Sequence, residues 1–148
     1  MKKIAAMMAF IAFFTHAGLT QELKSVPAIV TAVFKLKYPG ASHLQWMRDG
    51  DAYAVRFSHK NESCTARFDQ NGQWLDETHK VNFGELRNNV RNALSQGRFA
   101  NWRAYEVNEI QQRNKDVQYR IMVRNSNETE QRYLLFDAKG QMLKVLTL

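Results

Sequence analysis

The stretch Phe68-Asp69-Gln70-Asn71-Gly72-Gln73-Trp74-Leu75 decides how this chain folds, because a close copy of it follows later. The copy begins 68 residues further on and reads Phe136-Asp137-Ala138-Lys139-Gly140-Gln141-Met142-Leu143. The Phe, Asp, Gly, Gln and Leu positions are the same in both copies. A match at a fixed period indicates one supersecondary unit that is used twice. The two copies therefore predict a chain built from two equivalent halves.

Each copy has the composition of a β-turn between two strands. The Asp side chain can accept hydrogen bonds from the amides of the turn, and the Gly can adopt a positive φ. We expect the Phe to close one strand on its core side and the Leu to resume the core in the next. The alternative is a calcium loop, but such a loop needs further carboxylates at fixed spacing and a bidentate Glu, which the sequence lacks here. The pattern is therefore interpreted as structural.

The N-terminus has the three parts of a secretory signal peptide. Met1-Lys2-Lys3 is positively charged, residues 4–14 form an apolar run, and Thr15-His16-Ala17 supplies small residues before a cut after Ala17. The apolar run is too short for a transmembrane helix, which takes about 20 residues. The sequence thus predicts a signal peptide at residues 1–17, a mature protein without a membrane span, and a periplasmic or secreted location.

The remaining chain has the length of one domain, predicted at residues 22–148. Its first repeat is placed at residues 24–80 and its second at residues 81–148. Cys64 is the one cysteine in the sequence, so no intramolecular disulfide can form. We expect Cys64 to pack between strands as a small apolar residue, and a reactive thiol is the alternative.

Apolar periodicity predicts one helix and about four strands in each half. In the first half, a helix at residues 26–34 has Ser25 as its cap and Pro27 in its first turn, and Tyr38-Pro39-Gly40 ends it. Strands are expected at residues 43–48, 53–58, 63–68 and 73–78. In the second half, a helix at residues 83–94 precedes strands at 102–110, 117–124, 131–136 and 142–146. The predicted class is α+β, with the helices on one face of an antiparallel sheet.

Several of these stretches resemble a known family. They are the helix at residues 26–34, the segments Tyr38-Pro39-Gly40-Ala41 and Leu44-Gln45-Trp46, the strand Tyr53-Ala54-Val55-Arg56-Phe57, and the octapeptide that starts at Phe68. Together they resemble the PepSY-like, beta-lactamase-inhibitor-protein-like domain of exported bacterial proteins, especially those of Bacteroidota. The likeness covers essentially the whole mature chain and is strongest in its first half. It implies tandem helix-plus-sheet units, one long curved sheet and a non-catalytic binding or inhibitory role, and it assigns no functional residues.

Motifs for catalysis or for metal binding are not found in the sequence. It contains no G-x-S-x-G, no phosphate-binding glycine loop and no H-E-x-x-H. A metal site could be drawn on paper from His59, Glu62, Cys64 and His79, but no pair has the tight spacing of metal ligands. We therefore predict a protein that is not an enzyme and has no metal or cofactor.

The net charge favours acidic partners. The chain carries +7, and +5 remains when Lys2 and Lys3 of the predicted signal peptide are left out. The excess lies in residues 81–148, which hold 11 basic and 7 acidic residues. A basic bias attracts acidic partners or anionic surfaces. Nucleic acid is not expected for an exported protein.

Strand alternation also predicts which side chains point away from the helices. If Tyr53, Val55 and Phe57 face the helix, their neighbours face the other way. Arg, Trp, Tyr and Met are enriched in protein interfaces, and Met122 and Met142 are expected beside the basic residues. The alternative is a solvated face on which Arg stems cover apolar patches. The predicted partner-binding residues are Arg56, Arg67, Trp74, Arg120, Arg124 and Tyr133.

Taken together, these features predict an exported, non-catalytic binding protein. Its open sheet face would engage a protein partner in the cell envelope, as an inhibitor or regulator of a periplasmic or extracellular enzyme. The alternative is a carrier or sensor of a small or polymeric anionic ligand that uses the Arg-rich second half. A broad surface patch favours the first function, and a pocket with convergent polar groups favours the second.

Overall fold

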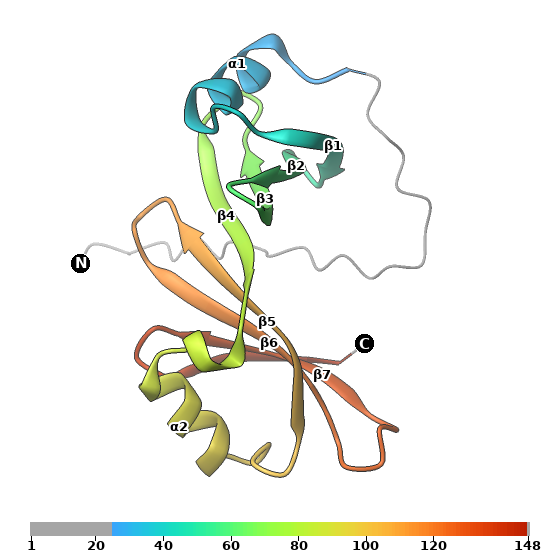
Figure 1. Cartoon of the computed structure of the whole chain (residues 1–148), viewed down its shortest axis with the longest axis vertical. Coiled ribbons are helices and arrows are strands. Elements are labelled where there is room, and N and C mark those ends of the chain that lie inside the picture. Colours follow the sequence, from blue (N-terminus) through green and yellow to red (C-terminus); the bar gives the residue numbers. More distant parts are fainter. Residues whose placement is uncertain (1–24, 148) are drawn as a thin grey trace, which may run out of the picture.

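The computed structural model describes residues 25–147 and consists of two helices and one eight-stranded antiparallel sheet (Figure 1). The strands follow one another in the sheet in chain order, from β1 to β8. The predicted α+β class is confirmed, and the predicted signal peptide at residues 1–17 lies outside the described residues. The elements are α1 (Ala28–Lys37), β1 (Ser42–Asp49), β2 (Ala52–His59), β3 (Glu62–Phe68), β4 (Trp74–Val81), the 3₁₀ helix η1 (Phe83–Glu85), α2 (Asn88–Gln96), β5 (Arg103–Gln112), β6 (Val117–Arg124), β7 (Gln131–Asp137) and β8 (Met142–Thr147).

Each helix packs on its own hydrophobic core. In the first core, the Phe34 ring of α1 lies edge-on against Phe57 of β2, with 5.0 Å between the ring centroids. In the second core, Val90 of α2 packs with Ile121 and Leu134, and all three are fully buried. Figure 1 shows α1 beside β1–β3 at one end of the molecule and α2 beside the later strands at the other end, with β4 running between them.

Both helices lie on the same face of the sheet. Side chains directly opposite each other in a ladder point to the same side. Ala66 of the first core is opposite Glu77, Glu77 is opposite Gln111, and Gln111 is opposite Val117. Val117 packs against the second core, so the helix side is continuous from β3 to β6. The opposite side is called the sheet face below.

The two copies of the octapeptide form the β3–β4 and β7–β8 turns. Asp69 and Asp137 each accept two backbone N–H bonds, from the residues two and four positions later, at 2.9 and 2.8 Å. Gly72 and Gly140 have φ values of +81° and +87°. The predicted roles of Asp and Gly in this motif are therefore confirmed.

Each of these glycines also touches the helix of its own half. A Cβ on Gly140 would lie 2.4 Å from the backbone oxygen of Asn89, the second residue of α2. A Cβ on Gly72 would lie 3.0 Å from the side chain of Ile29, the second residue of α1. Glycine at these positions therefore permits both the turn and the approach of the helix.

The helix starts differ from the predictions. Pro27 directly precedes α1 and is not in its first turn, and no side chain caps this helix, so the predicted cap Ser25 is wrong. In the second half, the residues at the predicted start of the helix form the separate 3₁₀ helix η1, and the Phe83 side chain is 45% exposed. Glu85 accepts the N–H of Asn82 at 2.5 Å and closes this short turn, and α2 begins only at Asn88.

Alanine at Gly140 should destabilise the fold more than alanine at Gly50. Gly50 has φ +58° and open space around it, so Gly50→Ala should cost only the left-handed strain, roughly 1–2 kcal/mol. Gly140→Ala adds a clash with the backbone of α2 and should lose at least about twice as much. Guanidinium unfolding of the two variants measures this difference, and equal losses would contradict the proposed packing.

Candidate functional site

Five of the six predicted partner-binding residues lie on the sheet face. Met122 and Tyr133 lie opposite each other in the β6–β7 ladder. Arg67 lies opposite Ala54 in the β2–β3 ladder, and Arg56, two residues after Ala54, points to the same side of the sheet. This face also contains buried side chains, among them Ile110 and Leu135. The five predicted residues on this face are Arg56, Arg67, Arg120, Arg124 and Tyr133.

A buried ionic network holds Arg67 in place on this face. Its Nη1 donates to Oδ2 of Asp49 at 2.9 Å, and its Nε donates to Oδ1 of Asp76 at 2.9 Å. The side chains of Arg67, Asp49 and Asp76 are 16%, 4% and 10% exposed. Hydrogen bonding to Asp76 is the largest effect raising the pKa of Arg67, and Asp49 adds to it. Arg67 is thus a fixed cation between strands β1 and β4.

Two further arginines of the sheet face lie against aromatic rings. The guanidinium carbon of Arg124 is 4.6 Å from the ring centroid of Tyr105, and its Nε donates to Gln131 at 2.9 Å. The guanidinium of Arg120 is 5.9 Å from the Tyr133 ring. Burial lowers the pKa of Arg120, and Glu106 acts in the opposite direction. The basic groups of β6 are therefore ordered by their neighbours.

The predicted outward orientation of Trp74 is wrong. Trp74 lies opposite Phe68 in the ladder and packs against the first core. Its indole N–H donates to the Tyr38 hydroxyl at 3.1 Å, and Nζ of Lys37 lies 4.2 Å from its ring. A register shift between Arg67 and Phe68 reverses the expected alternation.

The equivalent shift in the second half turns Met142 inward. It occurs between Leu135 and Phe136, and Met142 then lies opposite Phe136 and packs on the second core. Leu143 is left 45% exposed. The predicted core position of the Leu in this copy and the predicted outward position of Met142 are both wrong, for the same reason as at Trp74.

Cys64 is a buried residue of the first core, as predicted. Its side chain lies among apolar groups, and burial raises its pKa to about 11, with the charge of Glu77 as a further cause. Glu77 also accepts the Tyr38 hydroxyl at 2.7 Å, and burial followed by this hydrogen bond raises the pKa of Tyr38. His79 lies opposite Cys64 in the ladder. In the described part of the chain, no three His, Cys, Asp or Glu residues are placed to hold a metal ion.

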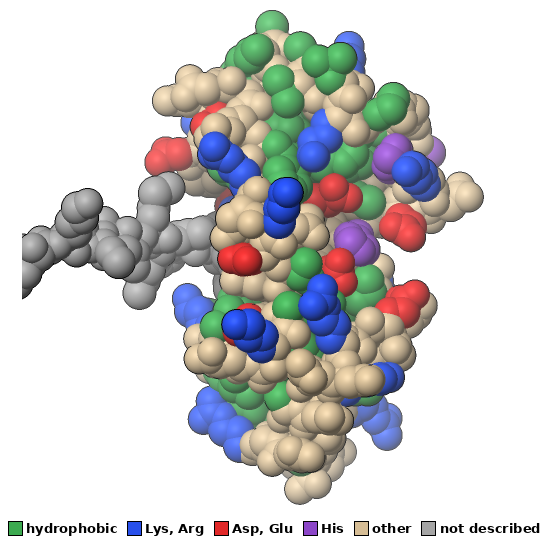
Figure 2. Space-filling model, turned by 90° about the vertical axis from the view of Figure 1, so that its left-hand side faces the viewer, with side chains coloured by type: hydrophobic (Ala, Val, Ile, Leu, Met, Phe, Trp, Pro, Cys, Tyr) green, Lys and Arg blue, Asp and Glu red, His purple; other side chains and the backbone are tan. Residues whose placement is uncertain are grey.

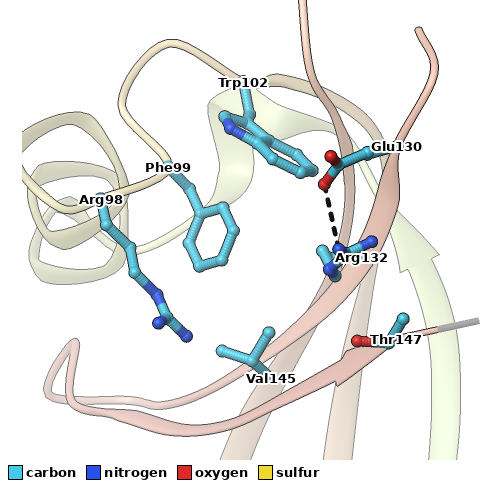
Figure 3. Close-up of a pocket in the computed structure, with 7 residues that line it drawn as sticks. All are labelled: Arg98, Phe99, Trp102, Glu130, Arg132, Val145 and Thr147. Carbon is cyan, nitrogen blue, oxygen red and sulfur yellow. Dashed lines mark hydrogen bonds and ion pairs between the residues drawn. The ribbon is translucent and has the colours of Figure 1, made fainter.

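A pocket of about 460 Å³ lies on the helix side of the second half (Figure 3). The loop after α2 contributes Arg98, Phe99 and Trp102, and the Phe99 and Trp102 rings meet edge to face at 5.1 Å. Nη2 of Arg132 is 3.0 Å from a carboxylate oxygen of Glu130, and strand β8 completes the wall. The seven lining residues are Arg98, Phe99, Trp102, Glu130, Arg132, Val145 and Thr147.

Sequence reasoning missed the pocket and the two carboxylates around Arg67. The cluster of Arg98, Phe99 and Trp102 within five positions was a usable signal, because basic and aromatic residues meet there between two elements. Asp76 could also have been found, since it faces Arg67 across the β3–β4 ladder. The contact with Asp49 comes from β1, 18 positions away, and no local pattern indicates it.

The basic excess does not form one continuous surface on the side shown in Figure 2. Lys and Arg side chains lie over both halves, and acidic side chains lie among them. On this side of the molecule, the arrangement does not favour a large polyanion.

Comparison with protein families shows to which family the chain belongs. Residues 51–144 match the family model described as "Putative beta-lactamase-inhibitor-like, PepSY-like". The chain belongs to this family. The family stated from the sequence is therefore confirmed, and the match begins after the helix at residues 26–34 and the segments up to Trp46 on which part of that resemblance rested.

Solved structures of Bacteroides proteins share the fold of this PepSY-like chain. A DUF2874 family protein of Bacteroides ovatus is 25% identical, with a TM-score of 0.76, and the match covers 84% of this chain and 89% of that one. A BLIP-like protein of Bacteroides fragilis is 20% identical, with a TM-score of 0.72 and coverages of 85% and 89%. A Bacteroides eggerthii protein, described as a putative periplasmic protein, is 22% identical, with a TM-score of 0.78 and coverages of 83% and 89%. The search of curated proteins found no match.

Within residues 25–147 of this PepSY-like chain, neither helix has the length and apolar character needed to cross a bilayer.

Replacing Arg67 by methionine should strongly destabilise the protein. Arg67→Met leaves Asp49 and Asp76 buried without their cation, and breaking a buried pair in this way costs about 3–5 kcal/mol. The matched control is Arg56→Met, because Arg56 is exposed on the same face and should change stability by less than about 0.5 kcal/mol. Urea unfolding at pH 7 measures both losses, and similar values would contradict a structural role for the network.

The Cys64 thiol should be almost inert in the folded protein. The thiolate is the reactive form, and a pKa of about 11 leaves little of it at pH 8. Labelling with iodoacetamide at pH 8 should be at least about tenfold slower in buffer than in denaturant, where the thiol has its ordinary pKa. Similar rates in the two conditions would show that Cys64 is accessible.

Proposed function

We propose that this protein is exported and binds a protein partner through its sheet face, as an inhibitor or regulator of a periplasmic or extracellular enzyme. We further infer that its two halves are tandem copies of one helix-plus-four-strand unit. The sheet-face residues proposed for the contact are Arg56, Arg120, Arg124 and Tyr133, with Arg67 as a fixed cation between them.

The observation that carries this proposal is the ordered set of basic and aromatic side chains on the sheet face. Arg67 is held by two carboxylates, and Arg124 is held by Tyr105 and Gln131. Side chains that are already fixed lose little conformational entropy when a partner binds. Arginine and tyrosine are also the residue types that most often dominate binding energy.

The size of the sheet face is compatible with such a contact. Strands lie about 4.8 Å apart and rise about 3.3 Å per residue. Eight strands of six to ten residues therefore outline a face of roughly 800 Å². This outline is of the same order as the area that each partner contributes to a standard interface, and its buried positions, such as Ile110 and Leu135, do not belong to the accessible part.

The comparisons support the same class of function. The family is described as beta-lactamase-inhibitor-like, and one structural neighbour is a BLIP-like protein. Export is supported by the signal-like pattern of residues 1–17 and by the neighbour described as a putative periplasmic protein. A binding role also accords with the sequence, which contains no catalytic motif.

Charge reversal on the sheet face should abolish partner recovery. We would capture proteins from an envelope extract of the source organism with the mature protein and with the Arg56→Glu/Arg124→Glu variant, and quantify them by mass spectrometry. The matched control is Lys35→Glu/Lys139→Glu, which changes the net charge equally at two exposed positions outside the sheet face. We expect a protein that is recovered by the wild type and the control, and lost with the sheet-face variant.

Two results would contradict this proposal. One is equal recovery by all three proteins, which would place the contact elsewhere on the molecule. The other is the absence of any protein above the background of empty beads. Circular dichroism spectra of the variants check that each is folded.

A further inference from the structure

The pocket on the helix side has the size and construction of a small-molecule site. Its volume of about 460 Å³ falls within the range of roughly 300–1,000 Å³ that is usual for such sites. Its walls come from the loop after α2, from the start of β7 and from β8. These segments are distant in sequence, and the fold brings their side chains together (Figure 3).

The charge of the pocket favours an anion. Arg98 and Arg132 line it together with one carboxylate, that of Glu130, which leaves one positive charge in excess. Glu130 pairs with Arg132 at 3.0 Å. Among residues 25–147, Arg98 has no carboxylate within ion-pair distance, and its guanidinium carbon lies 4.8 Å from the Phe99 ring. Arg98 is therefore the group available to a ligand anion.

The remaining walls favour a flat apolar group beside that anion. The Trp102 ring stands edge-on to Phe99, with an interplanar angle of 89°. Phe99 is 7% exposed, so its buried ring supports the Trp102 ring in this position. The guanidinium of Arg132 is 5.8 Å from the Trp102 ring, and Val145 adds an apolar side chain from β8. A planar ring can pack on such a surface with its edges or its face.

We propose that this pocket binds a small aryl carboxylate. The carboxylate pairs with Arg98, and the ring packs against Trp102 and Val145. Glu130 holds Arg132 over the indole and excludes ligands with a second negative charge near that end of the pocket. This site is separate from the sheet face, so the proposal does not depend on the protein partner.

The test compares two ligands of nearly the same shape, one of which is an anion and the other neutral. 2-Naphthoate is the anion, and 2-naphthamide is its neutral counterpart. Both are titrated into ¹⁵N-labelled mature protein, and the indole N–H signal of Trp102 and the backbone signals of the pocket are followed by NMR. Naphthoate should shift the pocket signals and bind at least about tenfold more tightly than naphthamide, as expected for one charge-assisted contact.

Four variants test the contact with Arg98 and the packing of the ligand ring. Arg98→Gln should weaken naphthoate by about tenfold and leave naphthamide unchanged, and Arg98→Lys should restore part of the affinity. Arg113→Gln removes one exposed arginine on the β5–β6 hairpin and should leave both ligands unaffected. Trp102→Leu should weaken both ligands equally, because it removes the ring surface.

The proposal is overturned by any of three results. Equal affinity for the two ligands would remove the role of the charge, and equal weakening by Arg98→Gln and Arg113→Gln would show a general charge effect. Naphthoate at millimolar concentration without any shift of the pocket signals would show that the pocket does not bind this class of ligand.

Discussion

The close approach of each Asp-Gly turn to the helix of its own half is the constraint on which the rest of the structure depends. Gly140 meets the backbone of Asn89, and Gly72 meets Ile29. Gly72 lies in the β3–β4 turn and Gly140 in the β7–β8 turn, so each contact ties the turn before β4 or β8 to the helix of the same half. The helix is then held over one side of its strands, and the alternation of side chains assigns every strand residue to the helix side or to the sheet face. Both hydrophobic core clusters lie on the helix side, and the side chains proposed for partner binding lie on the other side.

The sequence predicted the elements well because their signals are local. Alternating apolar residues, Asp-Gly turns and helix spacing lie within a few positions of one another, and they located all eight strands to within a few residues. Trp74 and Met142 were misplaced because a register shift is a property of two paired strands and leaves no mark in one of them. The error came from applying strict alternation through the turn.

The candidate sites were predictable only in part, for a related reason. Arg67 was expected on the sheet face, and it lies there, but its attachment to Asp49 depends on the pairing of β1, β2 and β3. The pocket depends on three segments that meet only in the folded chain. Composition showed that the second half is rich in arginine. It could not show that Arg98 and Arg132 line one pocket while Arg120 and Arg124 lie on the opposite side of the sheet.

Two adjacent residues of strand β7 belong to different surfaces, one to the pocket and the other to the sheet face. Arg132 lies on the helix side and lines the pocket, whereas Tyr133 lies on the sheet face opposite Met122. β7 is paired on both edges, with β6 and with β8, so a rotation that moved both side chains would break hydrogen bonds in two ladders. A ligand shifts a conformational equilibrium only through a difference in its affinity for the two states. A strand held in this way offers no second state of low energy, and occupancy of the pocket should therefore leave binding at the sheet face unchanged.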